Sequence, residues 1–498
     1  MQRASGILLH ISSLPGAYGI GDFGEGAYAF IDFLAAAGQS YWQILPLGLT
    51  GEGDSPYQSF SAFAGNPYFI DLKVLVDKGF LKKKEIRKAN FPSDKEFIDY
   101  ETLYHVKMAL LKKAYKRSRD TLIQAVMAFA EKERYWLEDF ALFMALKEWH
   151  GGQMWRHWQD AYKWRDREAI NTFRRDHQEA LEFWYFTQYL FFTQWFKLKA
   201  AAQEKGIKII GDLPIYVAED SADVWAHPEN YLLSDMGTPT VVSGCPPDAF
   251  SATGQLWGNP IYNWTHMKNN HYDWWVKRFR KSFEAFDMVR IDHFRGFEAY
   301  WQIPFGEETA IYGEWVKGPG IAFFRAIESA LGGTRLPIIA EDLGLLTDEV
   351  IAMRRQLGYP GMKILQFAFD TENESTYLPH FYTNEDIVYT GTHDNHTIMG
   401  WYKQAPKKER AYAKAYLKLE RGSGYHWGFI EGLMRSSAGL VVIPMQDVLG
   451  QDDQARMNFP STVGDNWRYR ISKNAFNRKI ARKLCDVTRL YSRLINKS

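Results

Sequence analysis

Residues 287–296 read DMVRIDHFRG, an apolar run that ends in charged side chains. Met288 and Ile291 are typical of a buried strand, whereas the charges of Arg290 and Asp292 are costly inside a sheet unless they are paired. Side chains at positions i and i+2 of a strand share a face, so Arg290 and Asp292 are predicted to lie together. The stretch therefore indicates a buried strand with a polar site at its C-terminal end.

Seven other stretches are also apolar runs that end in polar or charged residues. They are GILLHISS (6–13), YWQILPLG (41–48), IKIIGDLPIYV (207–217), PIIAEDLG (337–344), MKILQFAFD (362–370), DIVYTGTHDN (386–395) and LVVIPMQDVLG (440–450). Continuous apolar runs of this length favour strands that are buried on both faces, as in a parallel sheet. Helical patterns lie between most of them, for example at 24–38, 271–286, 347–358 and 425–439. Eight strands that alternate with helices predict an α/β fold, the (β/α)8 TIM barrel.

The length of 498 residues predicts large insertions, because such a barrel typically needs about 250 residues. We expect residues 1–498 to form one catalytic barrel with a mainly helical insertion at 73–205, after the second strand. A further insertion at 218–270 follows the third strand. It contains the Pro-, Gly- and aromatic-rich stretch 243–260, which we interpret as a long, irregular active-site loop.

Composition narrows the classes of partner and compartment. Sixty Lys and Arg residues against 59 Asp and Glu give a formal net charge of +1, which gives no reason to expect nucleic acid or an anionic membrane as a partner. The two cysteines lie far apart in sequence, which favours a reducing compartment over a disulfide framework. No apolar run approaches the roughly 18 residues of a membrane helix. We expect a cytoplasmic protein.

Aromatic residues make up 16% of the chain. An aromatic-rich core is the simpler explanation. However, Trp and Tyr also offer flat apolar faces with polar edges, which suit the faces and hydroxyl rims of sugars.

Polar side chains follow the predicted strands where a barrel enzyme carries its catalytic groups. In chain order these are His10, Asp212, Asp292, His293, Glu341, Asp342, Asp370, His393, Asp394, Asn395, Gln446 and Asp447. A single Asp at a strand end is often a helix cap or an ion-pair partner. We keep that interpretation for Asp342, Asp370 and Asp447. Carboxylates that close several neighbouring strands indicate a catalytic site.

Two of these carboxylates are predicted to differ in pKa. We expect Arg290 to lower the pKa of Asp292, and an ionised carboxylate is a competent nucleophile. Glu341 follows the apolar PIIA, so burial is expected to raise its pKa, as suits a general acid. This pairing is typical of retaining glycoside chemistry. Asp394 would stabilise positive charge in the transition state, and the histidines His293 and His393 would donate hydrogen bonds to sugar hydroxyls.

Two alternatives start from the same residues. His10, His293, His393, Asp292 and Asp394 could hold zinc or manganese, as in metal-dependent barrel hydrolases. Against this, the first strand has no His-x-His pair, and we expect no metal. Sugar binding without chemistry would not require Arg290, Asp292 and Glu341 together.

Four stretches, GIKIIGDLPIYV, MVRIDHFRG, IIAEDLG and YTGTHDN, correspond in order to the four strand motifs of the α-amylase superfamily. Three others, at 53–72, 245–264 and ILLHISSLPG, resemble one branch more closely than other amylases. The chain thus resembles, over nearly its whole length, the amylomaltases, which are bacterial 4-α-glucanotransferases also called disproportionating enzymes.

The resemblance implies roles for individual residues. Asp292 would be the nucleophile, Glu341 the acid/base and Asp394 the stabiliser of the transition state. The substrate contacts would be Arg290, His293, His393, Asn395, Asp212, Ser55, Tyr57, Asp248, Gln255 and Trp257. The family implies no metal or cofactor and no separate C-terminal β-domain, and we expect the end of the chain to be one loop plus a helix at 475–495.

The activity that the resemblance implies is transfer of α-1,4-glucan segments from a maltooligosaccharide, starch or glycogen chain to another glucan or to glucose. The transfer would pass through a covalent glycosyl-Asp intermediate. The protein would be a monomer or a small homo-oligomer. A retaining α-glucan hydrolase stays open as the alternative, because both reactions share the same intermediate.

Overall fold

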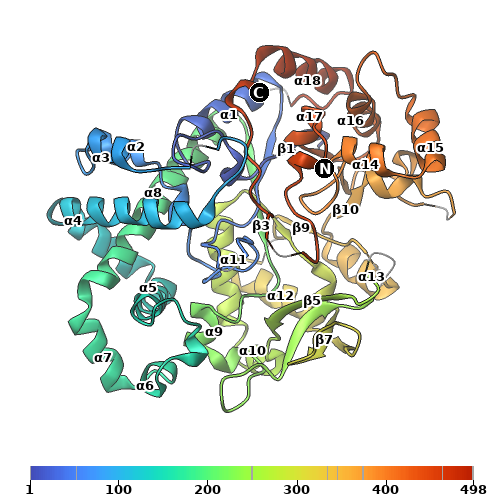
Figure 1. The fold of residues 1–498 in the computed structure, drawn as a ribbon. Coiled ribbons are helices and arrows are strands. Elements are labelled where there is room, and N and C mark those ends of the chain that lie inside the picture. Colours follow the sequence, from blue (N-terminus) through green and yellow to red (C-terminus); the bar gives the residue numbers. More distant parts are fainter. Residues whose placement is uncertain are drawn as a thin grey trace.

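The computed structural model describes residues 2–51, 53–92, 94–247, 251–333, 335–344, 346–372, 375–462 and 464–495. Eight parallel strands form one sheet in the order β10-β11-β12-β1-β2-β3-β6-β9 (Figure 1). The strands are β1 (Ala4–Leu8), β2 (Tyr41–Gln43), β3 (Lys208–Leu213), β6 (Met288–Ile291), β9 (Ile338–Ala340), β10 (Gly361–Ile364), β11 (Asp386–Tyr389) and β12 (Leu440–Pro444). Each begins within two residues of a predicted stretch, and the predicted (β/α)8 barrel is confirmed.

The sheet closes on itself between β9 and β10. The Ala340 N–H donates to the Pro360 carbonyl at 3.0 Å. The Asp342 carboxylate accepts from the Met362 N–H at 2.7 Å and pairs with Arg354 at 2.8 Å. Asp342 therefore closes the barrel as an ion-pair partner, which is the structural interpretation that the sequence favoured for it.

Helices between the strands cover the outside of the barrel (Figure 1). Their apolar faces pack against strands whose residues are almost all buried. These helices are α1 (Glu25–Ala36), α11 (Asp273–Ala285), α12 (Gly320–Ala330), α13 (Asp348–Leu357), α14 (Ile398–Gln404), α15 (Lys407–Leu417), α16 (Tyr425–Arg435) and α18 (Arg478–Leu490).

The segment between β2 and β3 is mainly helical. It contains α2 (Leu72–Asp77), α3 (Lys83–Lys88), α4 (Tyr100–Lys132), α5 (Arg134–Trp149), α6 (Asp160–Lys163), α7 (Arg167–Asp176) and α8 (Gln178–Glu204). Helices α4 and α5 both pack on α8, which buries a row of aromatic residues that includes Trp184 and Trp195. Much of the aromatic content therefore serves the core.

A second sheet, which the sequence did not predict, has four antiparallel strands in the order β5-β4-β7-β8. They are β4 (Val241–Cys245), β5 (Gln255–Pro260), β7 (Ala299–Pro304) and β8 (Glu314–Lys317). The stretch 243–260 was expected to be irregular, but residues 243–245 and 255–260 belong to this sheet. Its pairing partner β7 follows β6, more than 40 residues away in sequence, so no local pattern reveals the pairing. Between β3 and β5 also lie α9 (Ala222–Ala226) and the short helix η4 (Pro228–Asn230), and α10 (Trp264–Asn269) follows β5.

After β12 the described residues contain α17 (Met445–Val448), short turns and α18, and no strand. Among the described residues, no helix has the length and apolar character that crossing a membrane requires.

Candidate active site

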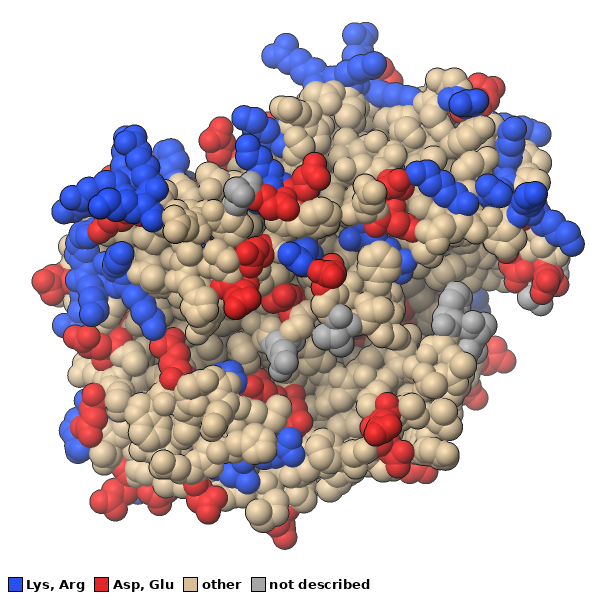
Figure 2. All heavy atoms as spheres, in the orientation of Figure 1, with Lys and Arg blue, Asp and Glu red and all other residues tan. Residues whose placement is uncertain are grey.

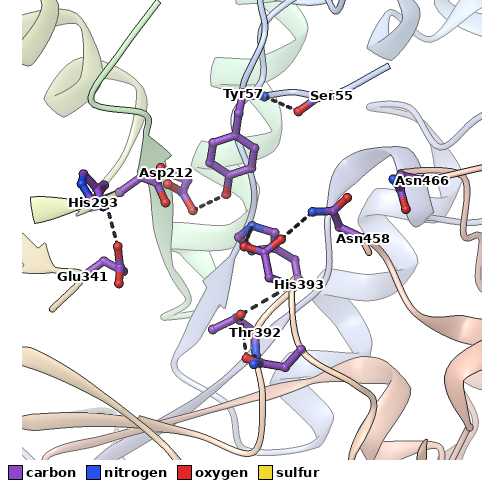
Figure 3. A network of polar contacts seen from close by, with 12 residues as sticks. Ser55, Tyr57, Asp212, His293, Glu341, Thr392, His393, Asn458 and Asn466 are labelled. Atoms are coloured by element: carbon purple, nitrogen blue, oxygen red, sulfur yellow. Dashed lines mark hydrogen bonds and ion pairs between the residues drawn. The ribbon is translucent and has the colours of Figure 1, made fainter. Parts of the chain in front are cut away.

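The polar ends of the barrel strands converge on one face of the molecule. That face is hollowed near its centre, with acidic side chains at the hollow (Figure 2). Figure 3 shows side chains from separate strand ends and loops that gather there, including Tyr57, Asp212, His293, Glu341 and His393. The structure brings together side chains that lie up to about 340 residues apart in sequence.

Arg290 forms the buried centre of the site. It is paired with Asp212 across the β3–β6 ladder, and its Nη1 donates to both Asp212 oxygens at 2.9 and 2.8 Å. The same nitrogen lies 3.0 Å from Asp292 Oδ1. Only 5% of the Arg290 side chain is exposed, and the Asp212 side chain is fully buried. Arg290 thus holds Asp292 on the shared face that the i, i+2 spacing predicted.

The pKa of Asp292 differs from the sequence-based expectation. Burial raises the pKa of Asp292 to about 6, and the attraction of Arg290 opposes this rise without reversing it. Arg290 acts in the expected direction, but burial outweighs it, so the predicted opposite shifts of the two carboxyls are wrong and the pKa of Asp292 lies above its ordinary value. The reason is that Asp212 and Asp394 add negative charge nearby, while the surrounding protein removes solvent from the carboxylate.

Glu341 follows β9 at the position next to Asp292 in the sheet, since Ile291 and Ala340 are ladder partners. Its carboxylate accepts from the His293 N–H at 2.7 Å and from the Leu343 N–H at 2.9 Å. Burial nevertheless raises the pKa of Glu341 to about 7, as predicted for a general acid.

The backbone of His293 turns at the end of β6, which makes its N–H contact with Glu341 possible. Its backbone lies in the left-handed region, with φ 49° and ψ 50°, which is uncommon for a residue other than glycine. This conformation ends the strand and directs the His293 N–H toward Glu341. Burial lowers the pKa of the imidazole to about 3, so the ring is neutral. Its buried Nε2 has no hydrogen-bond partner among the described residues.

Asp394 lies beyond β11, with its carboxylate held from two sides. Asn458 Nδ2 donates to Asp394 Oδ1 at 2.7 Å, and His393 Nε2 lies 3.3 Å from Oδ2. Arg456 donates to the Asp394 carbonyl at 2.6 Å. Because 44% of the Asp394 side chain is exposed, it remains open to a ligand.

Tyr57 and Ser55 come from the loop after β2. Tyr57 donates from its hydroxyl to Asp212 at 3.0 Å, and its ring stacks on His393 with centroids 5.2 Å apart. Ser55 accepts from the Tyr57 N–H at 3.3 Å. This loop therefore belongs to the same contact network as Arg290.

The second sheet contributes Trp257 and Gln255 from β5. Trp257 meets the His293 ring edge to face at 4.8 Å. Gln255 accepts from the Trp257 indole N–H at 3.1 Å. Both predicted residues thus lie beside the strand end that carries Asp292. The predicted contact Asp248 falls within residues 248–250, outside the described part of the chain.

Asn395 has a local partner. Its side-chain oxygen accepts from the Thr392 N–H and hydroxyl, both at 2.9 Å, and holds the turn before Asp394. Three residues after β12 were not predicted from the sequence: Asn458, Arg456 and Trp467, whose ring centroid lies 5.8 Å from that of Tyr57 and 5.7 Å from that of His393. They lie well beyond the end of β12, so the strand-end rule that located the other residues could not find them.

The geometry does not favour the metal alternative. Among the described residues, no group of three or more His, Cys, Asp or Glu side chains is arranged to hold a metal ion. His10 accepts from the Leu45 N–H at 3.2 Å through Nδ1 and packs edge to face on Phe69. Asp447 accepts from Thr390 and the Ile398 N–H, so its role is structural.

Comparison with known proteins agrees with this geometry. A family model described as 4-alpha-glucanotransferase matches residues 9–475. The chain is 49% identical to the 4-alpha-glucanotransferase of Clostridium butyricum, over 97% of this chain and all of that one. It is 48% identical to the Thermus thermophilus 4-alpha-glucanotransferase, over 95% of each chain.

A solved structure extends the match to three dimensions. The amylomaltase from Streptococcus agalactiae in complex with acarbose superposes with a TM-score of 0.96 at 42% identity, covering 99% of this chain and 100% of that one. On the family model and on relatives that match over their full length, the chain belongs to the 4-α-glucanotransferase family, the amylomaltases.

Proposed function

We propose that this 4-α-glucanotransferase moves α-1,4-glucan segments by double displacement, with Asp292 as nucleophile and Glu341 as acid/base. The observation that carries the proposal is the placement of the two carboxyls at neighbouring positions of adjacent strands, with Arg290 beside Asp292. Parallel strands lie about 5 Å apart. Retaining enzymes need a carboxyl separation of about 5–5.5 Å.

The pKa order supports this assignment of roles. Burial raises the pKa of both carboxyls, to about 6 for Asp292 and to about 7 for Glu341. Arg290 lies 3.0 Å from Asp292 and opposes the rise there. The carboxyl beside Arg290 is therefore the proposed nucleophile, and the carboxyl that accepts from two backbone N–H groups is the proposed acid.

In the first step an Asp292 oxygen attacks the anomeric carbon of the donor glucan. The bond from that carbon to the glycosidic oxygen breaks, and Glu341 gives its proton to the leaving oxygen. The reducing-end fragment leaves with a free 4-hydroxyl, and the remaining segment is an ester of Asp292.

In the second step the ionised Glu341 removes the proton from the 4-hydroxyl of an acceptor sugar. The acceptor oxygen bonds to the anomeric carbon, and the Asp292 carboxylate is released. Two inversions at the same carbon retain the α configuration. Glu341 ends protonated, ready for another cycle.

The surrounding residues are proposed to orient the sugar and stabilise the transition state. Asp394, fixed by Asn458 and His393, faces the positive charge that develops on the ring. His293 Nε2, which has no hydrogen-bond partner in the described part of the chain, is proposed to bond a sugar hydroxyl. The other proposed contacts are Ser55, Tyr57, Asp212, Gln255, Trp257, Asn395 and, outside the described residues, Asp248.

Transfer competes with hydrolysis at the ester intermediate. Water must be kept from the anomeric carbon while a sugar occupies the acceptor position. Trp257, which lies against His293, supplies an apolar wall for this purpose. We expect acarbose, with which the Streptococcus agalactiae amylomaltase was solved, to bind across Asp292 and Glu341 in this chain.

Incubation with maltotriose alone tests the proposal. Transfer produces glucose together with a ladder of longer maltooligosaccharides, while the total number of reducing ends stays constant. A hydrolase makes the reducing ends rise steadily. A steady rise without longer products would contradict the assignment of transfer and favour the retaining hydrolase.

A further inference from the structure

The turn that carries Asp394 is bound by a segment that is distant in sequence. The turn, residues 393–397, joins β11 to α14, whereas residues 452–459, which we call the clamp segment, follow β12 and α17. The Asn458 N–H donates to the His393 carbonyl at 3.1 Å, beside the bond from the Asn458 side chain to Asp394. Figure 3 shows Asn458 next to His393. The position of Asp394 therefore depends on two segments of the chain.

Arg456 lies in the clamp segment and bonds to the backbone on both sides of the contact. Its Nη2 donates to the Asp394 carbonyl at 2.6 Å, and its Nε donates to the Asn458 carbonyl at 2.8 Å. The guanidinium carbon lies 4.4 Å from the centroid of the Phe459 ring. The donors of a guanidinium point in fixed directions, so two carbonyls and one ring fix its orientation. Arg456 thereby fixes the peptide group between Asp394 and Asn395.

Asp453 joins the clamp segment to the other end of the turn. Its carboxylate accepts from the Thr397 N–H at 3.0 Å and lies 2.6 Å from His396 Nδ1. A carboxylate oxygen only accepts, so Nδ1 carries the hydrogen and donates it to Asp453. Arg456 Nη1 lies 3.2 Å from the same nitrogen and therefore packs beside this pair without bonding to it. Only 18% of the Asp453 side chain is exposed, so little water competes for these bonds.

The close approach of Asp453 to the turn depends on a glycine in α14. This helix begins directly after the turn, with Thr397 as its N-cap residue. A Cβ atom at Gly400 would lie 1.9 Å from Asp453 Oδ1, which no real side chain could tolerate. Glycine is unfavourable inside a helix, so this position loses helix stability and admits the carboxylate. The Asp453 carboxylate thus occupies space that the side chain of any other residue at position 400 would fill.

We propose that Arg456 and Asp453 are positioning residues for glucan transfer, which act by fixing the direction of the Asp394 carboxylate. Arg456 holds the peptide group after Asp394, and Asp453 holds the end of the same turn. The inference rests on the proposed role of Asp394 in the transition state. A carboxylate that is already aimed at the developing positive charge stabilises it without reorganising. Loss of this aim should therefore lower kcat and leave KM nearly unchanged.

Arg456→Ala is the first test, with Arg3→Ala as the matched control. Arg3 is also partly buried and donates to backbone carbonyls, but it precedes β1 at the opposite end of the barrel. Both substitutions remove a guanidinium from carbonyl groups, so both should lower the melting temperature. With maltotriose, Arg456→Ala should lower kcat by about 10- to 100-fold and keep KM within about threefold, whereas Arg3→Ala should keep kcat. Equal kcat values for the two variants would overturn the role of Arg456.

Arg456→Lys carries the test if Arg456→Ala does not fold. The ammonium group keeps the charge but reaches one carbonyl at a time, whereas the guanidinium bonds to two in fixed directions. We expect a folded protein whose kcat is about three- to tenfold below that of wild type, with KM unchanged. A wild-type kcat in folded Arg456→Lys would show that the two-carbonyl geometry has no part in the reaction, and the proposal would fail.

Asp453→Asn tests the other end of the turn, with Asp452→Asn as its control. The amide nearly keeps the shape of the carboxylate and still fits against Gly400, but it removes the charged acceptor for His396. Asp452 is the neighbouring carboxylate, and it pairs with Lys403 at 2.7 Å. We expect kcat to fall by about tenfold for Asp453→Asn and to stay within about twofold for Asp452→Asn. Equal kcat values for these two variants would refute the role of Asp453.

A crystal structure of Arg456→Lys shows directly whether Arg456 acts through Asp394. We expect the Asp394 carboxylate to point in a new direction or to adopt two conformers. An Asp394 that superposes on the wild-type residue, in a variant with lowered kcat, would overturn the inference.

Asp394→Asn in the same assay separates this inference from the proposed function. If Asp394→Asn keeps the wild-type kcat, the proposed role of Asp394 fails, and the positioning roles fail with it. If Asp394→Asn loses activity while Arg456→Ala and Asp453→Asn keep theirs, the proposed function stands and only the positioning roles are refuted.

Discussion

The barrel and the four-stranded sheet border the same active site but are built differently. Every residue of β1, β11 and β12 is buried, whereas β8 has no buried residue and β5 has only two. The barrel side supplies the charged groups Arg290, Asp292 and Glu341. The sheet side supplies Gln255 and Trp257.

The difference in burial between the barrel and the four-stranded sheet suits them to different roles. Barrel strands fix their neighbours through a closed ladder, so Asp292 and Glu341 keep a set spacing, as bond-making chemistry requires. The sheet is assembled from the segments after β3 and β6, and we propose that its surface contacts the sugar chain. We therefore expect substitutions on the barrel side to lower kcat and those on the sheet side mainly to raise KM.

The largest effect is expected for Asp292→Asn. The amide has nearly the same shape but cannot form the ester intermediate, so kcat for maltotriose disproportionation should fall by about 10⁴-fold or more. Asp287→Asn is the matched control. Asp287 lies just before the same strand, at its opposite end, where its carboxylate accepts from the Ile209 N–H. If Asp292→Asn keeps a rate close to that of the control, Asp292 is not the nucleophile.

Asn458→Ala is expected to have an intermediate effect. It removes the hydrogen bond to Asp394 Oδ1 and leaves the carboxylate without its anchor from the segment after β12. A hydrogen bond to a charged group contributes about 1.5–3 kcal/mol, so kcat should fall by roughly 10- to 150-fold with little change in KM. Asn474→Ala, an exposed residue of the same C-terminal part, is the control. A change in KM alone would place Asn458 in substrate binding instead.

The pH dependence tests the two carboxyls together. Asp292 must be ionised, so kcat/KM should rise as the pH increases through about 6. Glu341 must be protonated, so kcat/KM should fall as the pH increases through about 7. The profile is therefore a bell with its maximum between these values and limbs of about tenfold per pH unit. Glu341→Gln should remove the alkaline limb from the residual activity, and an unchanged limb would exclude Glu341 as the acid.

How much of each region the sequence predicts depends on whether local patterns or distant contacts build it. The eight barrel strands have continuous apolar runs that end in polar groups, and this local signal located Asp212, Asp292, Glu341 and Asp394 at one face. Arg290 was placed beside Asp292 by the period of a strand. The pKa of Asp292 was not predictable, because it depends on burial by segments distant in sequence. The β4–β7 pairing was not predictable either, because the two strands are far apart in sequence and meet only in the folded protein.

Trp257→Ala sharpens the comparison from the sheet side. The indole lies against His293, and we propose that it helps to keep water from the intermediate. Its removal should raise KM for maltotriose by roughly tenfold, since it deletes a large apolar contact, and should leave kcat within about threefold. It should also increase the reducing ends released per transfer. Leu256→Ala is the matched control, because adjacent residues of a strand point to opposite faces and Leu256 is 38% exposed. If Trp257→Ala instead lowers kcat as strongly as Asn458→Ala, the division between the two regions fails, because the sheet would then help to hold the reacting groups themselves.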